Sequence, residues 1–355
     1  MKSEKMSLLA KYCARDKDDF YFICDELNMI IKLNIKNNNI SIINSIPDGE
    51  AVERSIMGGI YVFNRELYIA TYKTKKIWIY NLDARKWIGI ERKKLPNMAF
   101  DGMLQVFEYE NFIYMVGTTY PAIIVINPIN KEIEYIEEPF KAKGNPELMI
   151  DAYFRAQHVS LDDFLYLPCC LDNTVLKMNL KTREYQWITV GRKENRYSGI
   201  IYDGRHFWLS PRFNTNVVEW DCEKFIREIK LPPNYPLEIN YFCGIIDSDE
   251  SVLLCNMLNK KSLRIQKESG EKSIEECQFI FVKQINGMVI QQEIDGKISM
   301  YKNNTKVFDS ILKIKRQVAR EYFKSKKMTM YNGTGIYREG NVYSLNEFIE
   351  AFFEQ

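Results

Sequence analysis

The strongest constraint on the fold is a unit of about 45 residues that recurs along the chain. In this unit an apolar run ends in Asn or Asp, a short polar turn follows, and a second apolar run begins, as in residues 77–90 (IWIYNLDARKWIGI). Two alternating strands around a turn that an Asn or Asp side chain can stabilise predict a β-hairpin. The Asn or Asp falls at Asn34, Asn81, Asn127, Asn179 and Asp221, at spacings of 47, 46, 52 and 42 residues.

A second marker precedes each hairpin and keeps nearly the same spacing. It is a polar turn followed by a strand with a large apolar residue near its centre, at Phe22, Tyr68, Tyr114, Tyr166, Trp208, Leu253 and Val289. About nine residues earlier lies a further apolar run, which in several units carries small residues: Gly58 and Gly59, Ala156, Ser198 and Gly199, and Cys243 and Gly244. The agreement of the two markers predicts four strands in each unit.

Four antiparallel strands at this period predict an all-β fold, a closed β-propeller of seven blades. Small residues suit the innermost strands, which crowd round the axis, and Trp87, Tyr135 and Trp187 suit the outermost strands, where the gap between blades widens. Six blades with an irregular segment is the alternative, because the last two units are the weakest. The expected blades are residues 7–46, 55–92, 102–137, 152–190, 197–230, 241–275 and 278–311.

In period and aromatic placement, residues 7–311 resemble the kelch and WD-type propellers. The resemblance is one of architecture. The kelch di-glycine follows the second strand of a blade, whereas Gly58 and Gly59 precede that strand here. Trp220 and Asp221 form the one Trp-Asp pair in this repeat, and they end a third strand instead of closing a blade. No site residues are therefore carried over from either family.

Residues 312–355 do not repeat the four-strand unit and are predicted to form a helical extension beside a propeller of residues 1–311. Apolar residues at helical spacing and many Lys and Arg residues predict a basic amphipathic helix over residues 311–327. Such a helix packs on the rim of the propeller with its charges in water, or it binds a membrane surface or an acidic partner. A capping box at Ser344 and Glu347 predicts a second helix.

The charge and cysteine content narrow the class of protein. There are 49 Lys and Arg residues against 47 Asp and Glu, a net charge of +2, so no global basic field favours nucleic acid as a partner. The 8 Cys residues lie mostly in apolar runs without a CxxC pair, which is typical of reduced packing thiols and a cytoplasmic location. Neither a signal peptide nor a transmembrane segment is expected.

Few residues indicate catalytic chemistry. Of the 2 His residues, His158 lies in a predicted innermost strand, where it could face the central channel as a general base or ligand. The Asp clusters fall where a first strand turns into a second, so they are interpreted as turn formers, and neither a metal site nor a cofactor is predicted.

The face made by the loops that enter each blade and the loops between second and third strands is the predicted binding surface. Its Arg and Tyr residues would suit a protein or peptide partner, with a small molecule or glycan as the alternative ligand. The first hypothesis is therefore a non-catalytic binding module or scaffold. The second is a propeller hydrolase or lyase acting on a sugar or cyclic peptide around His158, and the third is membrane association through residues 311–327. The candidate binding residues are Arg54, Tyr153, Arg155, His158, Arg196, Tyr197, Arg212 and Tyr241.

Overall fold

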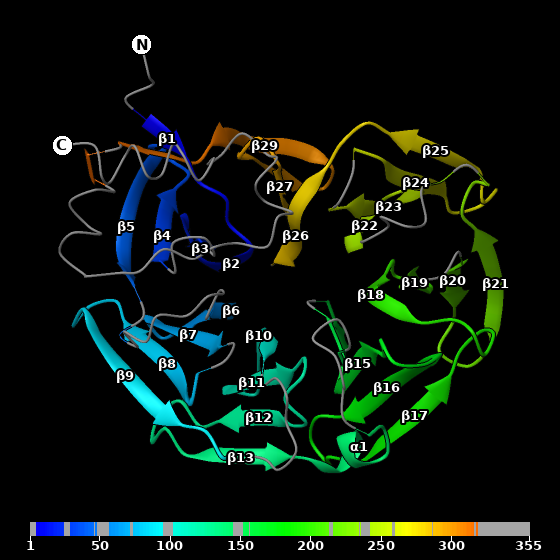
Figure 1. Cartoon of the computed structure of the whole chain (residues 1–355), viewed down its shortest axis with the longest axis horizontal. Coiled ribbons are helices and arrows are strands. Elements are labelled where there is room, and N and C mark those ends of the chain that lie inside the picture. Colours follow the sequence, from blue (N-terminus) through cyan, green and yellow to red (C-terminus); the bar gives the residue numbers. More distant parts are fainter. Residues whose placement is uncertain are drawn as a thin grey trace.

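The computed structural model shows a ring of small antiparallel sheets around a central axis (Figure 1). The described residues are 5–24, 29–45, 47, 57–71, 74–94, 102–144, 152–155, 157–212, 216–233, 235, 242–257, 260–285, 287–315 and 317–318.

Each of the first four blades contains four strands in chain order. Blade 1 has β2 (Tyr12–Asp16), β3 (Asp19–Cys24), β4 (Met29–Asn34) and β5 (Asn39–Ser45); blade 2 has β6 (Met57–Phe63), β7 (Glu66–Thr71), β8 (Lys76–Asn81) and β9 (Lys86–Glu91); blade 3 has β10 (Met103–Tyr109), β11 (Phe112–Gly117), β12 (Ile123–Ile126) and β13 (Ile133–Ile136); blade 4 has β14 (Val159–Leu161), β15 (Phe164–Pro168), β16 (Thr174–Asn179) and β17 (Tyr185–Thr189).

The last three blades follow the same order, and a two-stranded sheet lies beside the first and last blades. A short helix, α1 (Glu138–Lys141), follows blade 3. Blade 5 has β18 (Tyr197–Tyr202), β19 (Phe207–Pro211), β20 (Asn216–Trp220) and β21 (Phe225–Lys230); blade 6 has β22 (Phe242–Ser248), β23 (Ser251–Asn256), β24 (Ser262–Gln266) and β25 (Lys272–Glu275); blade 7 has β26 (Phe279–Ile285), β27 (Met288–Glu293), β28 (Lys297–Lys302) and β29 (Thr305–Ile311); β1 (Lys5–Ser7) pairs with β30 (Lys313–Lys315).

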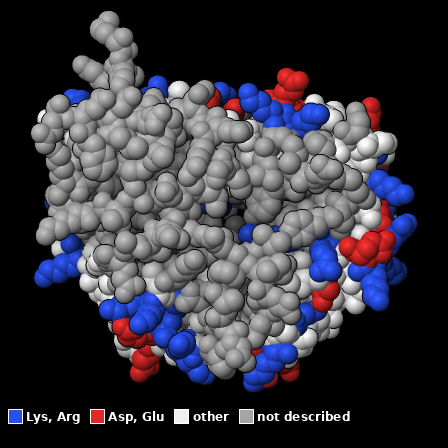
Figure 2. Space-filling view, viewed as in Figure 1, with Lys and Arg blue, Asp and Glu red and all other residues white. Residues whose placement is uncertain are grey.

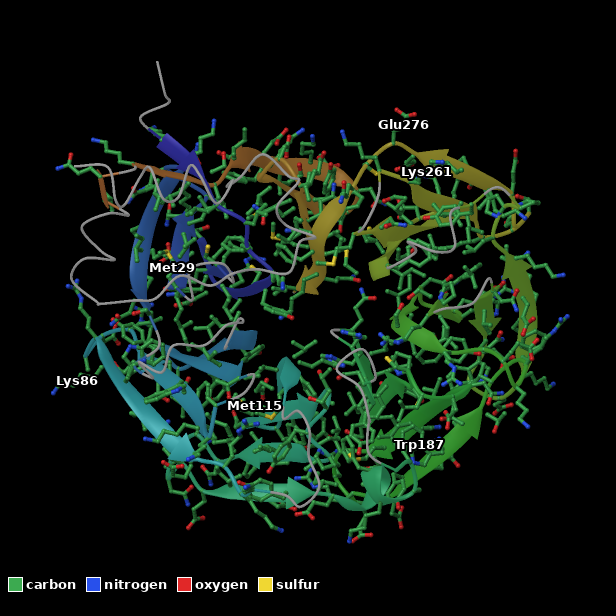
Figure 3. The ribbon with its side chains drawn as sticks, in the orientation of Figure 1. Met29, Lys86, Met115, Trp187, Lys261 and Glu276 are labelled. Carbon is green, nitrogen blue, oxygen red and sulfur yellow. The ribbon has the colours of Figure 1, made fainter. Side chains whose placement is uncertain are left out.

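The sequence prediction of seven blades is confirmed, and the alternative of six is wrong, because the units that begin at β22 and β26 each form a complete four-stranded sheet. The seven large apolar residues that mark the repeat all lie in second strands. The predicted taper is confirmed as well, since Gly58 and Gly199 lie in innermost strands and Trp87 and Trp187 in outermost strands. Figure 3 shows Trp187 toward the rim of the ring.

The recurring Asn or Asp has the predicted role in the hairpins between third and fourth strands. In blade 4 the Asn179 Oδ1 atom accepts hydrogen bonds from the backbone N–H groups of Lys181 (2.9 Å) and Thr182 (3.0 Å). The same bonds to N–H groups two or three positions later occur at Asn34, Asn81, Asn127 and Asp221. A side chain that replaces backbone partners fixes the turn and therefore the register of the two strands.

Replacing Asn179 with Ala is expected to lower the free energy of unfolding by about 1 kcal/mol, because two turn N–H groups lose their acceptor. Asn179→Asp is the matched control, since Asp221 accepts the equivalent bonds in blade 5. Chemical denaturation of the two variants and the wild type measures the difference. Equal losses for Ala and Asp would contradict this role.

The same hairpins also join neighbouring blades. Lys131 has a positive φ of 63° in the hairpin of blade 3, and its Nζ atom donates to the Tyr68 hydroxyl of blade 2 at 2.9 Å. Arg183, with a φ of 66° in blade 4, donates to the Tyr114 hydroxyl of blade 3 at 2.5 Å. In blades 3 and 4 the left-handed turn therefore directs a cation to the second-strand tyrosine of the preceding blade.

The predicted basic helix does not begin at Ile311, and this part of the prediction is wrong. Ile311 ends β29, and Lys313–Lys315 form β30 against β1. Ile314 is buried between two exposed lysines, a period-2 pattern that a short window cannot distinguish from one face of a helix. Residues 317–318 are helical, and residues 316 and 319–355 lie outside the described residues.

Candidate functional site

The predicted binding face can be located from the strand order. In a blade of four consecutive antiparallel strands, the segment that enters the first strand and the loop between second and third strands meet at one end. In blades 4 and 5 the described parts of these segments are residues 152–155, 157–158, 169–173, 190–196 and 212. Figure 2, which looks along the ring axis, shows a hollow at the centre with Lys or Arg atoms inside it.

Three of the predicted arginines, Arg155, Arg196 and Arg212, come together on this face between blades 4 and 5, and we call them the arginine cluster. The guanidinium of Arg196 donates to the carbonyl of Leu171, and the backbone N–H of Arg212 donates to the carbonyl of Arg196 at 2.8 Å. Arg212 is only 3% exposed, whereas Arg196 is exposed. The cluster therefore joins a buried guanidinium to one that solvent and a partner can reach.

Cys170 lies near two members of the arginine cluster, Arg155 and Arg212. Burial raises the pKa of the Cys170 thiol, and the positive charges of Arg212 and Arg155, with a hydrogen bond from Arg155, partly offset that rise. Its backbone N–H donates to the carbonyl of Tyr153 at 2.9 Å. The thiol is thus protonated at neutral pH, and two arginines from different blades act on the same sulfur atom.

The two predicted tyrosines do not belong to the exposed face. Tyr153 is 1% exposed and packs edge-on against Phe140, and burial raises its pKa to about 12. Tyr197 is fully buried, and its hydroxyl donates to the carbonyl of Val190 at 2.5 Å. Both rings fill the core between blades, so they support the loops instead of presenting a surface. Arg54 and Tyr241 lie outside the described residues.

The segment that enters blade 4 leaves the sheet. In blade 5 the first strand pairs with the whole of the second strand, up to Pro211. In blade 4 the first strand pairs with the second only up to Tyr166, so Leu167 and Pro168 pair with the third strand alone. The sequence predicts that His158 lies in the innermost strand of blade 4. This prediction is wrong, because His158 precedes β14.

Gln157, in this segment, spans from blade 4 to blade 6. Its Nε2 atom donates to the carbonyl of Ile245 at 2.9 Å, and its Oε1 atom accepts from the N–H of Ile245 at 3.0 Å. A Cβ atom on Gly199 would lie 2.4 Å from the Gln157 Oε1 atom, and one on Gly244 would lie 3.1 Å from its Nε2 atom. The glycines predicted to relieve crowding near the axis thus make room for one amide that links two blades.

His158 lies against an aromatic ring of blade 3. Its ring packs on Phe107 at 4.6 Å between centroids. Burial, together with the positive charge of Lys283 in β26 of blade 7, lowers the pKa of His158 to about 3. The imidazole is therefore neutral at neutral pH, and its Nδ1 atom is buried without a hydrogen-bond partner among the described residues.

This pKa predicts a loss of stability in mild acid. In the unfolded chain His158 is protonated below about pH 6.5, whereas in the folded protein it stays neutral down to about pH 3. The free energy of unfolding therefore falls as the pH drops between these values. Between pH 7.5 and pH 5 the expected contribution is a loss of about 2 kcal/mol. Urea denaturation at both pH values should show that His158→Phe loses about 2 kcal/mol less than the wild type, and an equal loss would contradict the assignment.

Lys283, Gln105 and Gln157 are not among the residues that the sequence singles out. A signal exists only for Lys283, which interrupts the apolar run FIFVKQI in a predicted innermost strand. The two glutamines act through side-chain contacts with other blades, which no local pattern encodes.

Within the described part of the chain, no group of three or more His, Cys, Asp or Glu side chains is placed to hold a metal ion. Among the same residues, no helix has the length and apolar character needed to cross a membrane.

Comparison with known proteins identifies the fold. No family model matches the chain, and no curated protein matches it in sequence. A streptogramin B lyase structure has a TM-score of 0.59 at 12% identity over 86% of this chain and 94% of that one. A catalytically inactive histidine variant of virginiamycin B lyase from Staphylococcus aureus, with quinupristin, has a TM-score of 0.60 at 12% identity over 86% and 95%.

BamB from Moraxella catarrhalis is similar to the same degree, with a TM-score of 0.59 at 10% identity over 83% of this chain and 86% of that one. Identities this low show a shared fold and nothing about activity. By its own strand order and by these likenesses, the chain is a seven-bladed β-propeller.

Proposed function

We propose that the protein is a non-catalytic binding module whose arginine cluster holds a carboxylate of a peptide partner. The observation that carries the proposal is the convergence of Arg155, Arg196 and Arg212, from three separate segments, on the face where propeller loops gather. A planar guanidinium recognises a carboxylate through two parallel hydrogen bonds, so a cluster of them favours Asp, Glu or a C-terminal carboxylate.

The supports of the cluster favour binding without a large rearrangement. Gln105 donates to the carbonyl of Arg155, and Gln157, two residues later, is tied to blade 6. Groups held by such contacts lose little freedom when a partner binds, and this preorganisation increases affinity.

The surroundings of His158 favour a binding role over the alternative of a propeller enzyme. A general base needs an ionisable partner or substrate within hydrogen-bond reach, and His158 makes no hydrogen bond to the described residues. The lowering of its pKa to about 3 also makes the His158 imidazole a weak base. A hydrolase or lyase that acts on a sugar or cyclic peptide therefore has less support than peptide binding. The cytoplasmic location expected from the cysteines remains a prediction.

The test is a selection from a displayed library of random peptides against the wild type and against Arg155→Gln/Arg196→Gln. We expect the wild type to enrich peptides with Asp, Glu or a free C-terminal carboxylate, and the double variant to bind them at least ten-fold more weakly. Arg205→Gln is the matched control, because Arg205 is exposed in the same blade on the opposite face. Enriched peptides without acidic groups, or equal binding by the double variant, would refute the proposal.

A further inference from the structure

A further arginine lies on the predicted binding face, beside the arginine cluster. Arg192 belongs to the segment that enters blade 5, the same segment that carries Arg196, and its side chain is 61% exposed. The N–H of Asn195 donates to the carbonyl of Arg192 at 3.0 Å, which closes a tight turn over residues 192–195. The ends of such a turn lie less than about 7 Å apart. Since Arg196 follows the turn directly, Arg192 lies close to the exposed member of the cluster.

A buried glutamate holds Arg192 in place. Glu228 lies in β21, the outermost strand of the same blade, and its side chain is only 8% exposed. Its Oε1 atom accepts hydrogen bonds from the backbone N–H of Arg192 at 3.1 Å and from the Asn195 Nδ2 atom at 2.7 Å. Its Oε2 atom forms an ion pair with the Arg192 Nε atom at 3.0 Å. One carboxylate therefore fixes both the backbone and the side chain of Arg192.

The surroundings of this carboxylate leave the turn little freedom. Asn195 is fully buried, and its Oδ1 atom accepts a hydrogen bond from the Asn216 Nδ2 atom of β20 at 3.1 Å. Gly191 has a positive φ of 69°, and a Cβ atom there would lie 2.6 Å from the Asn195 Nδ2 atom and 3.0 Å from the Glu228 Oε1 atom. A guanidinium held by such a turn loses little freedom when it binds, and this preorganisation increases affinity.

The ion pair with Glu228 occupies only one side of the guanidinium. Within the described part of the chain, the two Nη atoms of Arg192 make no hydrogen bond, and the side chain is mostly exposed. A guanidinium has five N–H donors, four of them on its Nη atoms. Arg192 can therefore keep its contact with Glu228 and donate to a carboxylate of a partner at the same time.

We propose that Arg192 binds a second acidic group of the peptide, so that the partner carries two acidic side chains two or three residues apart. This inference rests on the proposed function of the arginine cluster. The turn keeps the Cα atoms of Arg192 and Arg196 within about 11 Å of each other. In an extended peptide, residues two or three positions apart are separated by about 7–10 Å. One carboxylate then binds at Arg196 and the other at the Nη atoms of Arg192.

The test is a double-mutant cycle that uses the full chain and the tightest acidic peptide from the displayed library. In this peptide each Asp or Glu is replaced in turn by Asn or Gln. Arg192→Gln should bind the unchanged peptide about ten-fold more weakly than the wild type does, because a charge-assisted hydrogen bond is lost. It should bind the peptide without the second acidic group as the wild type does.

Lys193→Gln is the matched control. Lys193 is an exposed neighbour in the same turn, so the substitution removes the same charge from the same place on the face. Loss of an exposed charge that no contact holds should change the affinity by less than about three-fold. An effect as large as that of Arg192→Gln would show that only the net charge of the turn matters, and it would overturn the inference.

Arg192→Lys keeps the test decisive if thermal unfolding shows that Arg192→Gln does not fold. A lysine keeps the charge but has no Nη atoms to present, so this variant should still bind the unchanged peptide several-fold more weakly than the wild type. Equal binding by Arg192→Lys and the wild type, or enriched peptides with a single acidic group, would overturn the second contact and leave the proposed function intact. If the library enriched no acidic peptide, the proposed function itself would fail, and this inference with it.

Discussion

Gly58→Ala is expected to destabilise the ring by about 3 kcal/mol. A Cβ atom at Gly58 would lie 1.9 Å from the Met103 carbonyl oxygen and 3.2 Å from that of Ala70. Both are backbone atoms, so they cannot rotate away, and the innermost strands of blades 2 and 3 would have to separate. Overpacking of this kind typically costs about 1–3 kcal/mol, and a backbone obstacle belongs at the upper end of that range.

Gly89→Ala is the matched control for this prediction. The nearest neighbours of a Cβ atom there would be side-chain atoms of Trp78 and Lys76 on the outer part of blade 2, and not backbone atoms. Thermal unfolding of the two variants should therefore show a much larger drop in melting temperature for Gly58→Ala. If both variants melted at the same temperature, the close packing of β6 against β10 would not be a constraint on the ring.

Gln157→Ala is expected to lower the free energy of unfolding by about 2 kcal/mol and to weaken peptide binding at the arginine cluster. The variant leaves both the N–H and the carbonyl of Ile245 without their partner, and a buried polar group without a partner costs about 1–3 kcal/mol. Since Gln157 fixes the segment that carries Arg155, its loss should also free the loop. Denaturation and a peptide-binding titration measure the two effects.

Gln291→Ala is the control for the loss of a glutamine. Gln291 lies in β27 of blade 7 and makes one long hydrogen bond, of 3.5 Å, to the hydroxyl of Tyr301. It should lose well under 1 kcal/mol and bind peptide normally. Equal effects of the two substitutions would show that the link between blades 4 and 6 does not support the binding face.

The fold could be predicted because its determinants are local and repeat. The Asn179 turn, the large residue of each second strand and the glycines near the axis each leave a mark at a fixed place in the unit. The start of the C-terminal segment could not be predicted in this way. Ile314 takes its conformation from pairing with β1, some 300 residues earlier in the chain, and a window of a few residues cannot register such a partner.

The position of the candidate site could be predicted from the sequence, but the exposure of its residues could not. Strand order alone places Arg155, Arg196 and Arg212 at one end of their blades, and the structure brings them together. Exposure does not follow from strand order, and Tyr153 and Tyr197 are buried because the gap between blades needs aromatic rings.

The location of the binding surface is tested most directly by hydrogen exchange of the protein with and without the tightest peptide from the library. We expect the peptide to slow exchange in residues 152–155, 169–173, 195–197 and 211–212, which surround the arginine cluster. Protection confined to the hairpins at the opposite end of the blades, such as residues 127–132 and 179–184, would place the partner on the other face and contradict the proposed function.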